Sequence, residues 1–140
     1  MVSNSTAAWE RTSARHRRLI YAALVVATVT AGLVLHFHGG SLHPDVRDIL
    51  GDFLWASMIY WLLAGAAPNS RPWWRVIAAI GICVAVEFSQ LVQTEWLEAA
   101  RSTSIGHLVL GSNYDSRDLL AYGFGVAAAG ILDRWLIESR

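Results

Sequence analysis

The sequence predicts an all-α polytopic membrane protein with four transmembrane helices and a short interfacial helix between the third and the fourth. Three observations support this fold class: 54% of the residues are hydrophobic, only 16% are charged, and long runs carry no charge at all. Soluble domains carry about a quarter charged residues. With 140 residues, the chain has room for one domain.

The first predicted helix covers residues 19–37, a run without Asp, Glu, Lys or Arg that follows the basic cluster Arg15, His16, Arg17 and Arg18. A helix needs about twenty mainly apolar residues to cross a bilayer core of about 30 Å. A cleaved signal peptide is the alternative, but its apolar region is about 7–15 residues long and ends at a cleavage site of small residues. We therefore predict a retained helix, preceded by a polar, basic and cytoplasmic segment at residues 1–18.

Three further helices complete a single transmembrane domain over residues 19–137. They are predicted at about residues 46–67, 74–93 and 118–137. Pro44 suits the first turn of the second helix, and the PNSRP sequence at 68–72 ends that helix. Asp115 is a predicted N-cap for the last helix. Between the third and fourth helices, Trp96, Leu97 and Ala100 share one helical face, so a short interfacial helix and a loop are expected there on the outer side.

The distribution of arginines predicts the orientation, since short cytoplasmic loops carry an excess of positive residues. For four spans, eight arginines fall on the side of both termini and three on the other side. The first group is Arg11, Arg15, Arg17, Arg18, Arg71, Arg75, Arg134 and Arg140, and the second is Arg47, Arg101 and Arg117. We therefore expect a multi-pass protein of the inner (plasma) membrane with both termini in the cytoplasm.

Glu87 is the most informative residue, because an ionisable side chain inside a membrane helix costs about 2.5–3.5 kcal/mol. Gln90 and Thr94 lie on the same helical face, so this polar stripe is expected to face the interior of the bundle. The alternative is that Glu87 is a solvated residue at a thinned outer rim of the membrane.

Asp52 and Asp118 stand at the outer starts of the second and fourth helices. Each alone is explained by a carboxylate stabilising a helix N-terminus. Together with Glu87 they lie at one depth, and Arg101 is the nearest loop cation, expected to contact Glu87 directly or through one ligand atom. The predicted ligand-binding residues are Asp52, Glu87, Gln90, Arg101 and Asp118.

Other features point to no additional chemistry. The spacing of His36, His38 and His43 is a weak metal signal that no cysteine supports, so we predict no metal and no cofactor. Zero net charge provides no overall basic field for nucleic acid. In the last helix, Ala121, Gly125 and Ala129 allow close helix packing, either within the chain or in a homo-oligomer.

Three of these segments resemble the VanZ-like group of small bacterial membrane proteins: VEFSQL at 86–91, Arg101, and RDLLAYGFG at 117–125. GDFLWA at 51–56 and LGS at 110–112 look closer to a sister family of uncharacterised integral membrane proteins, catalogued as domain of unknown function 2809. The likeness covers about residues 19–135. The chain departs from the VanZ pattern where GDFLWA replaces the usual Asp-Lys-x-x-His.

The resemblance implies four helices and a link to the cell envelope, with Glu87, Gln90, Arg101 and Asp118 at matching positions, but it supplies no reaction. The leading hypothesis is an outward-facing polar pocket that binds a membrane lipid head group or an envelope lipid precursor. The alternative is a membrane-embedded enzyme that acts on a lipid or lipid-linked glycan, with Glu87 as acid or base and Arg101 holding a phosphate. Proton or ion movement ranks lower, because a relay would stop at Glu87.

Overall fold

The computed structural model describes residues 3–103, 106, 109–111 and 115–135. Within these ranges the chain is helical and contains no strand, which confirms the all-α prediction. The elements are α1 (Ser3–His38), η1 (Gly39–Ser41), α2 (Pro44–Ala66), α3 (Pro72–Ser89), α4 (Glu95–Arg101) and α6 (Asp118–Asp133).

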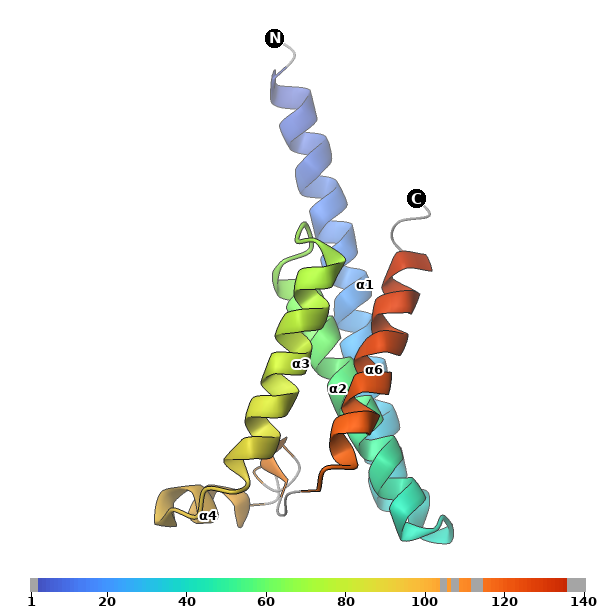
Figure 1. Ribbon diagram of the computed structural model, residues 1–140. Helices are drawn as coiled ribbons and strands as arrows, with labels where there is room; N and C mark the ends of the chain where they lie inside the picture. Colours follow the sequence, from blue (N-terminus) through green and yellow to red (C-terminus); the bar gives the residue numbers. More distant parts are fainter. Residues whose placement is uncertain (1–2, 104–105, 107–108, 112–114, 136–140) are drawn as a thin grey trace.

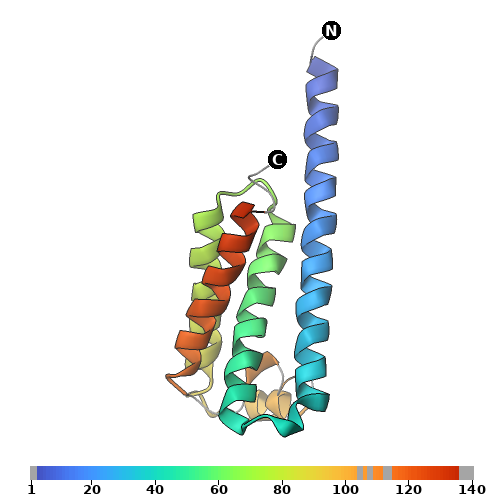
Figure 2. The same ribbon diagram turned by 90° about the vertical axis from the view of Figure 1, so that its right-hand side faces the viewer.

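Helix α2 is the centre of the bundle, since it packs against α1, α3 and α6, and α3 also packs against α6. In Figure 1, α3 and α6 lie in front of α2 and slope together down to the left, whereas α2 slopes down to the right. Figure 2 shows α1 beside α2 with its N-terminus projecting past the other helices. We call the end with loop 67–71 the α2–α3 end. The opposite end, with η1, α4 and the start of α6, is the α4 end.

The helix boundaries follow mostly from the expected signals. Pro44 occupies the first turn of α2, and Pro72 does the same for α3. The backbone of residues 3–18 continues into α1 as one helix, so the predicted N-terminal segment is not separated from the first span by a break.

Two boundaries correct the expectations. Helix α3 ends at Ser89, four residues before the predicted end at 93, because the backbone N–H groups of the next residues donate to carbonyls three residues earlier. Arg101 Nη2 donates to the Ser89 carbonyl oxygen at 2.6 Å. Asp115 is not a side-chain N-cap of α6. Its carboxylate instead accepts from the backbone N–H of Arg117 at 2.9 Å, and only its carbonyl accepts from the Asp118 N–H.

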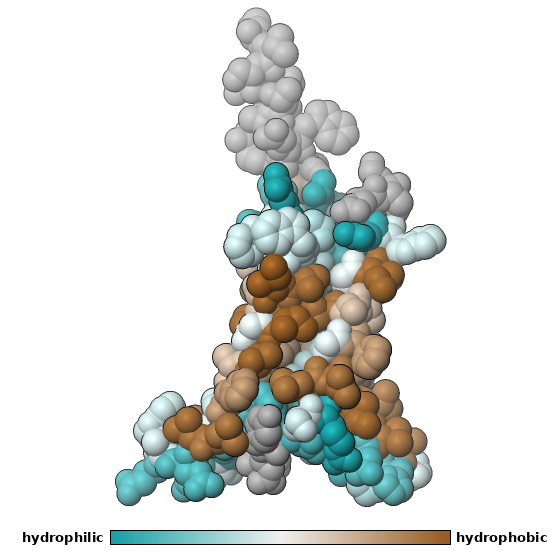
Figure 3. Space-filling view, viewed as in Figure 1, coloured by the Kyte–Doolittle hydropathy of each residue, from teal (hydrophilic) through white to brown (hydrophobic). Residues whose placement is uncertain are grey.

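Three helices in the described ranges are long and apolar enough to cross a membrane: 14–41, Pro44–Ala66 and Pro72–Ser89. The chain is a membrane protein. Helix α6 has 16 residues to Asp133, which is shorter than these three, and Leu136 and Ile137 of the predicted fourth helix lie outside the described residues. Hydrophobic side chains form a band across the middle of the bundle in Figure 3, with hydrophilic side chains toward both ends.

Helices α2 and α6 are in close contact at Gly125. A Cβ on Gly125 would meet the Phe53 carbonyl oxygen and come within 3.2 Å of Ala56 Cβ. Ser57 reinforces the contact by donating to the Gly125 carbonyl at 3.1 Å. Ala121 and Ala129 are buried on the same face of α6, so the small residues pack within the chain.

Candidate functional site

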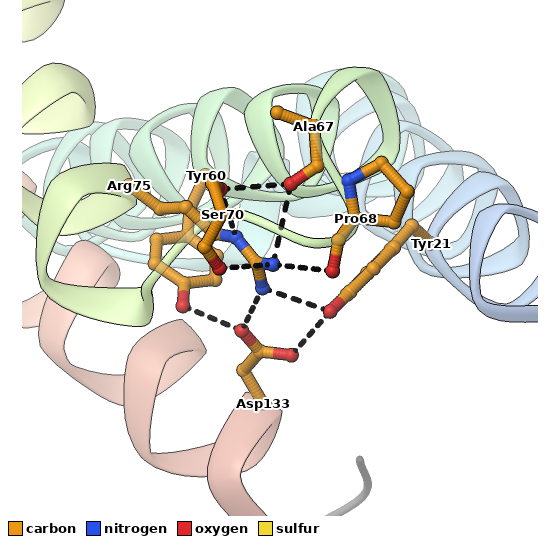
Figure 4. A network of polar contacts seen from close by, with 7 residues as sticks. All are labelled: Tyr21, Tyr60, Ala67, Pro68, Ser70, Arg75 and Asp133. Carbon is orange, nitrogen blue, oxygen red and sulfur yellow. Dashed lines mark hydrogen bonds and ion pairs between the residues drawn. The ribbon is translucent and has the colours of Figure 1, made fainter. Parts of the chain in front are cut away.

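The α2–α3 end holds a polar network built around Arg75 and Asp133 (Figure 4). Arg75 Nη1 donates to Asp133 Oδ2 at 2.7 Å and to the Tyr21 hydroxyl at 2.9 Å. The hydroxyls of Tyr21 and Tyr60 each donate to Asp133 at 2.7 Å. The network therefore joins α1, α2, α3 and α6.

Arg75 is also satisfied by the loop that precedes its own helix. Nε donates to Ser70 Oγ at 2.9 Å, and Nη2 donates to the carbonyls of Pro68 and Ser70, both at 2.8 Å. Because every polar group around the guanidinium has a partner, the network is suited to fixing the helix packing rather than to binding a ligand. Sequence reasoning missed it; Asp133, an acidic residue at the end of an apolar run, was the available signal.

The α4 end holds Glu87, whose side chain is completely buried. Its Oε1 accepts from the backbone N–H of Asp115 at 2.8 Å, and its Oε2 accepts from the Tyr122 hydroxyl at 3.2 Å. Gln90 Nε2 lies 3.5 Å from the same Oε2. The alternative of a solvated rim residue is wrong, because Glu87 lies inside the bundle.

Two further carboxyl groups meet Glu87 from the neighbouring helices. Asp52 of α2 and Asp118 of α6 are neighbours, and both are close enough to Glu87 for charge repulsion. Two neighbouring carboxylates can only accept hydrogen bonds, so they repel each other unless a donor or a cation lies between them. We call Asp52, Glu87 and Asp118 the carboxylate cluster.

Gln90 borders the cluster and is 8% exposed. Its amide lies against Gly111, where a Cβ would come within 2.5 Å of Gln90 Nε2, and where φ is +64°, a backbone conformation that favours glycine. Gln90 Oε1 has no hydrogen-bond partner among the described residues. Trp55 Nε1 and Thr94 Oγ1 are buried without one as well. In contrast to the Arg75 network, this end keeps unused hydrogen-bonding capacity.

Arg101 does not join the carboxylate cluster. It donates to the carbonyls of Ser89 and Val92, at 2.6 and 3.2 Å, and so caps the C-terminal end of α3. No ion pair within the described ranges includes Glu87. Arg101 therefore makes no direct contact with Glu87, because backbone carbonyls at a helix C-terminus bind the cation instead. Contact through a ligand atom stays a prediction.

The remaining polar residues lie outside the cluster. His43 Nδ1 lies 3.7 Å from Asp45, with both side chains exposed. The described part of the chain has no group of three or more His, Cys, Asp or Glu residues arranged to hold a metal ion. Asp115 and Arg117 form an exposed ion pair of 2.8 Å, and hydrogen bonding from Arg117 lowers the pKa of the Asp115 carboxyl.

Comparison with known families supports the resemblance drawn from GDFLWA and LGS. The family described as "Protein of unknown function (DUF2809)" matches residues 42–126, which is more than half of the chain. The chain belongs to this family. The match includes the whole carboxylate cluster together with Gln90 and Arg101, whereas Tyr21 and Asp133 of the Arg75 network lie outside it. No solved structure matches the chain.

Proposed function

We propose that the protein crosses the inner (plasma) membrane four times, with both termini in the cytoplasm and the α4 end on the outer side. The positive-inside distribution supports this orientation. Exposed tryptophans at both ends suit the two membrane interfaces: Trp73 and Trp74 at the α2–α3 end, and Trp96, 71% exposed, on α4. Helix α6 supplies the fourth span and α4 lies in the outer interface.

We propose that the carboxylate cluster binds the ammonium group of an envelope lipid head group. The single observation that carries this is the meeting of Asp52, Glu87 and Asp118, from three helices, without an ion pair to any described cation. Each carboxylate of the cluster that is ionised adds negative charge. A bound ammonium group would offset that charge.

The charge of the cluster changes the expected ligand chemistry. Arg101 Nη1 and Nη2 donate to the Val92 and Ser89 carbonyls, so these two nitrogens are not free to hold a phosphate beside Glu87, while Nε is buried without a partner among the described residues. Carboxylates repel phosphate and attract cations, and a primary ammonium offers three hydrogen-bond donors. Gln90 Oε1, buried and unpaired among the described residues, is one further acceptor for such a donor. The VanZ-like resemblance agrees with an envelope lipid as the source of this group.

The test is native mass spectrometry of the purified full chain with lipids that share acyl chains and differ in head group. We expect retention in the order phosphatidylethanolamine, phosphatidylcholine, phosphatidylglycerol, since choline cannot donate hydrogen bonds and glycerol has no cation. Asp118→Asn and Glu87→Gln should reduce phosphatidylethanolamine retention by about tenfold, as expected for one lost charge-assisted hydrogen bond. Asp45→Asn, at an exposed position on α2, is the matched control. Equal retention of the three lipids by wild type would contradict the proposal.

An enzyme that acts on a lipid or lipid-linked glycan is the second candidate. It is favoured by the Asp52 and Asp118 pair, because two neighbouring carboxyl groups can supply an acid and a base. Incubation of the protein with the retained lipid separates the two functions. A mass change of the lipid that is abolished in Glu87→Gln indicates catalysis, whereas retention without any product indicates binding.

A further inference from the structure

A second lipid-facing feature lies at the α2–α3 end, away from the carboxylate cluster. It is a groove of about 360 Å³ between α3 and α6. Its apolar lining consists of Trp73, Val76 and Ile77 from α3 and Ala127, Gly130 and Ile131 from α6. These parts of α3 and α6 face the viewer in Figure 3, within the hydrophobic band.

Small residues on α6 create the groove. A Cβ on Gly130 would lie only 3.4 Å from Val76 Cγ2, so the two helices are close at this point. Ala127, one turn before Gly130, is exposed and leaves space between Ile77 and Ile131, which are 54% and 60% exposed. In a bilayer, lipid acyl chains lie against such a surface, and an acyl chain is narrow enough to lie in an apolar groove.

A positive charge also lines the groove. Arg134 follows directly after α6, its side chain is exposed, and within the described ranges no hydrogen bond or ion pair engages its guanidinium. The adjacent Asp133 is already occupied by Arg75, Tyr21 and Tyr60. An arginine fork binds phosphate through two parallel hydrogen bonds.

We propose that this groove is a binding site for an anionic phospholipid, with one acyl chain along α3 and α6 and its phosphate on Arg134. The lining provides two kinds of contact in one place, apolar along its length and cationic at Arg134. A phospholipid is the membrane component that carries both matching parts. This site is independent of the proposed function, since it lies at the opposite end of the bundle and selects the opposite charge.

The experiment measures retention of phosphatidylglycerol and phosphatidylcholine with matched chains by native mass spectrometry of the full chain. Arg134→Ala should reduce retention of phosphatidylglycerol by about tenfold, the effect of losing a hydrogen bond to a charged group. Retention of phosphatidylcholine should fall less, because its choline ammonium already offsets the phosphate charge. Arg71→Ala is the charge control, because Arg71 is exposed at the same end but does not line the groove. Arg134→Lys should restore part of the preference.

The groove itself is tested by Ala127→Leu, which fills it, against Ala128→Leu, which adds the same side chain at an exposed position outside the lining. We expect Ala127→Leu to reduce retention of both lipids and Ala128→Leu to leave it unchanged. Equal effects of the two leucines would overturn the groove. Displacement of the lipid by inorganic phosphate, with no effect of Ala127→Leu, would assign Arg134 to a free anion and also overturn the proposal. Phosphatidylethanolamine retention at the carboxylate cluster should be the same in Arg134→Ala, which keeps the two sites distinguishable.

Discussion

Arg75 and Asp133 form an ion pair of 2.7 Å in which the two side chains are only 5% and 3% exposed. They are 58 residues apart, and their contact joins the start of α3 to the end of α6. A buried pair is costly to break, because the remaining charge keeps its desolvation penalty and loses its partner. The pair therefore makes the relative position of the two helices specific.

Replacing one member of this pair should lower the free energy of unfolding more than replacing both. Arg75→Leu leaves the Asp133 carboxylate buried and unpaired, and we expect a loss of about 3–5 kcal/mol in the free energy of unfolding. Arg75→Leu combined with Asp133→Leu should recover part of that loss, measured by thermal unfolding in detergent. Arg71→Leu is the matched control at an exposed arginine. A double variant less stable than Arg75→Leu alone would contradict the expectation.

Gly125→Leu should destabilise the bundle by about 3 kcal/mol, because its side chain would collide with the backbone at Phe53. Gly123→Leu is the control on the same helix, and Gly32→Leu is the control on α1, since an added Cβ meets nothing within 4 Å at either position. Thermal unfolding in detergent compares the three. Equal melting temperatures would show that α2 and α6 are not in close contact at Gly125.

Arg101→Ala should weaken the protein by freeing the Ser89 and Val92 carbonyls at the end of α3. The expected cost is about 1–2 kcal/mol, as for hydrogen bonds to a charged donor at a partly exposed site. Adding Glu87→Gln should bring no recovery, because Arg101 does not neutralise Glu87. Recovery of stability in this double-mutant cycle would contradict the structure and support a direct contact between Glu87 and Arg101.

The pKa of Asp115 should depend on Arg117. Hydrogen bonding by Arg117 lowers the pKa of this carboxyl, so Arg117→Ala should raise it toward its ordinary value. A folded-state pKa below the unfolded value stabilises the fold above the unfolded pKa, and this contribution is lost as the pH falls through the folded pKa. Carboxyl NMR titration measures the change, with Arg47→Ala as the control. An unchanged titration of Asp115 in Arg117→Ala would refute the prediction.

Reporter fusions test the proposed orientation. A cytoplasmic reporter placed after Asn69 should be active, and a reporter that works only outside the cytoplasm should be active after Ser112. These positions lie on opposite sides of α3 in the chain. Reversed signals would place the α4 end in the cytoplasm, and the carboxylate cluster would then face the wrong leaflet for an outer head group.

The sequence was sufficient for features that depend on one helix at a time. Uncharged runs predicted α1, α2 and α3, and the cost of an ionisable residue in an apolar helix predicted that Glu87 faces inward. The spacing of small residues predicted the close packing at Gly125. Each of these follows from local composition or from helical periodicity.

Features that depend on lateral packing were not predictable in the same way. Arg75 and Asp133 both look like ordinary residues at helix ends, and only the positions of α1 and α2 bring Tyr21 and Tyr60 to them. From the sequence, Arg101 could bind either a carboxylate or the carbonyls of a helix terminus. Which of the two it binds depends on how α4 folds back over α3, and sequence spacing alone does not determine this.

The contacts of Arg75 also bear on the order in which the chain enters the membrane. Its loop partners, Pro68 and Ser70, are synthesised just before it, so a growing chain can shield most of the guanidinium as soon as α3 emerges. Asp133 is synthesised 58 residues later, so the contact between α3 and α6 is the last of the Arg75 contacts that can form. A chain that ended before Asp133 would therefore lack the ion pair that joins α3 to α6.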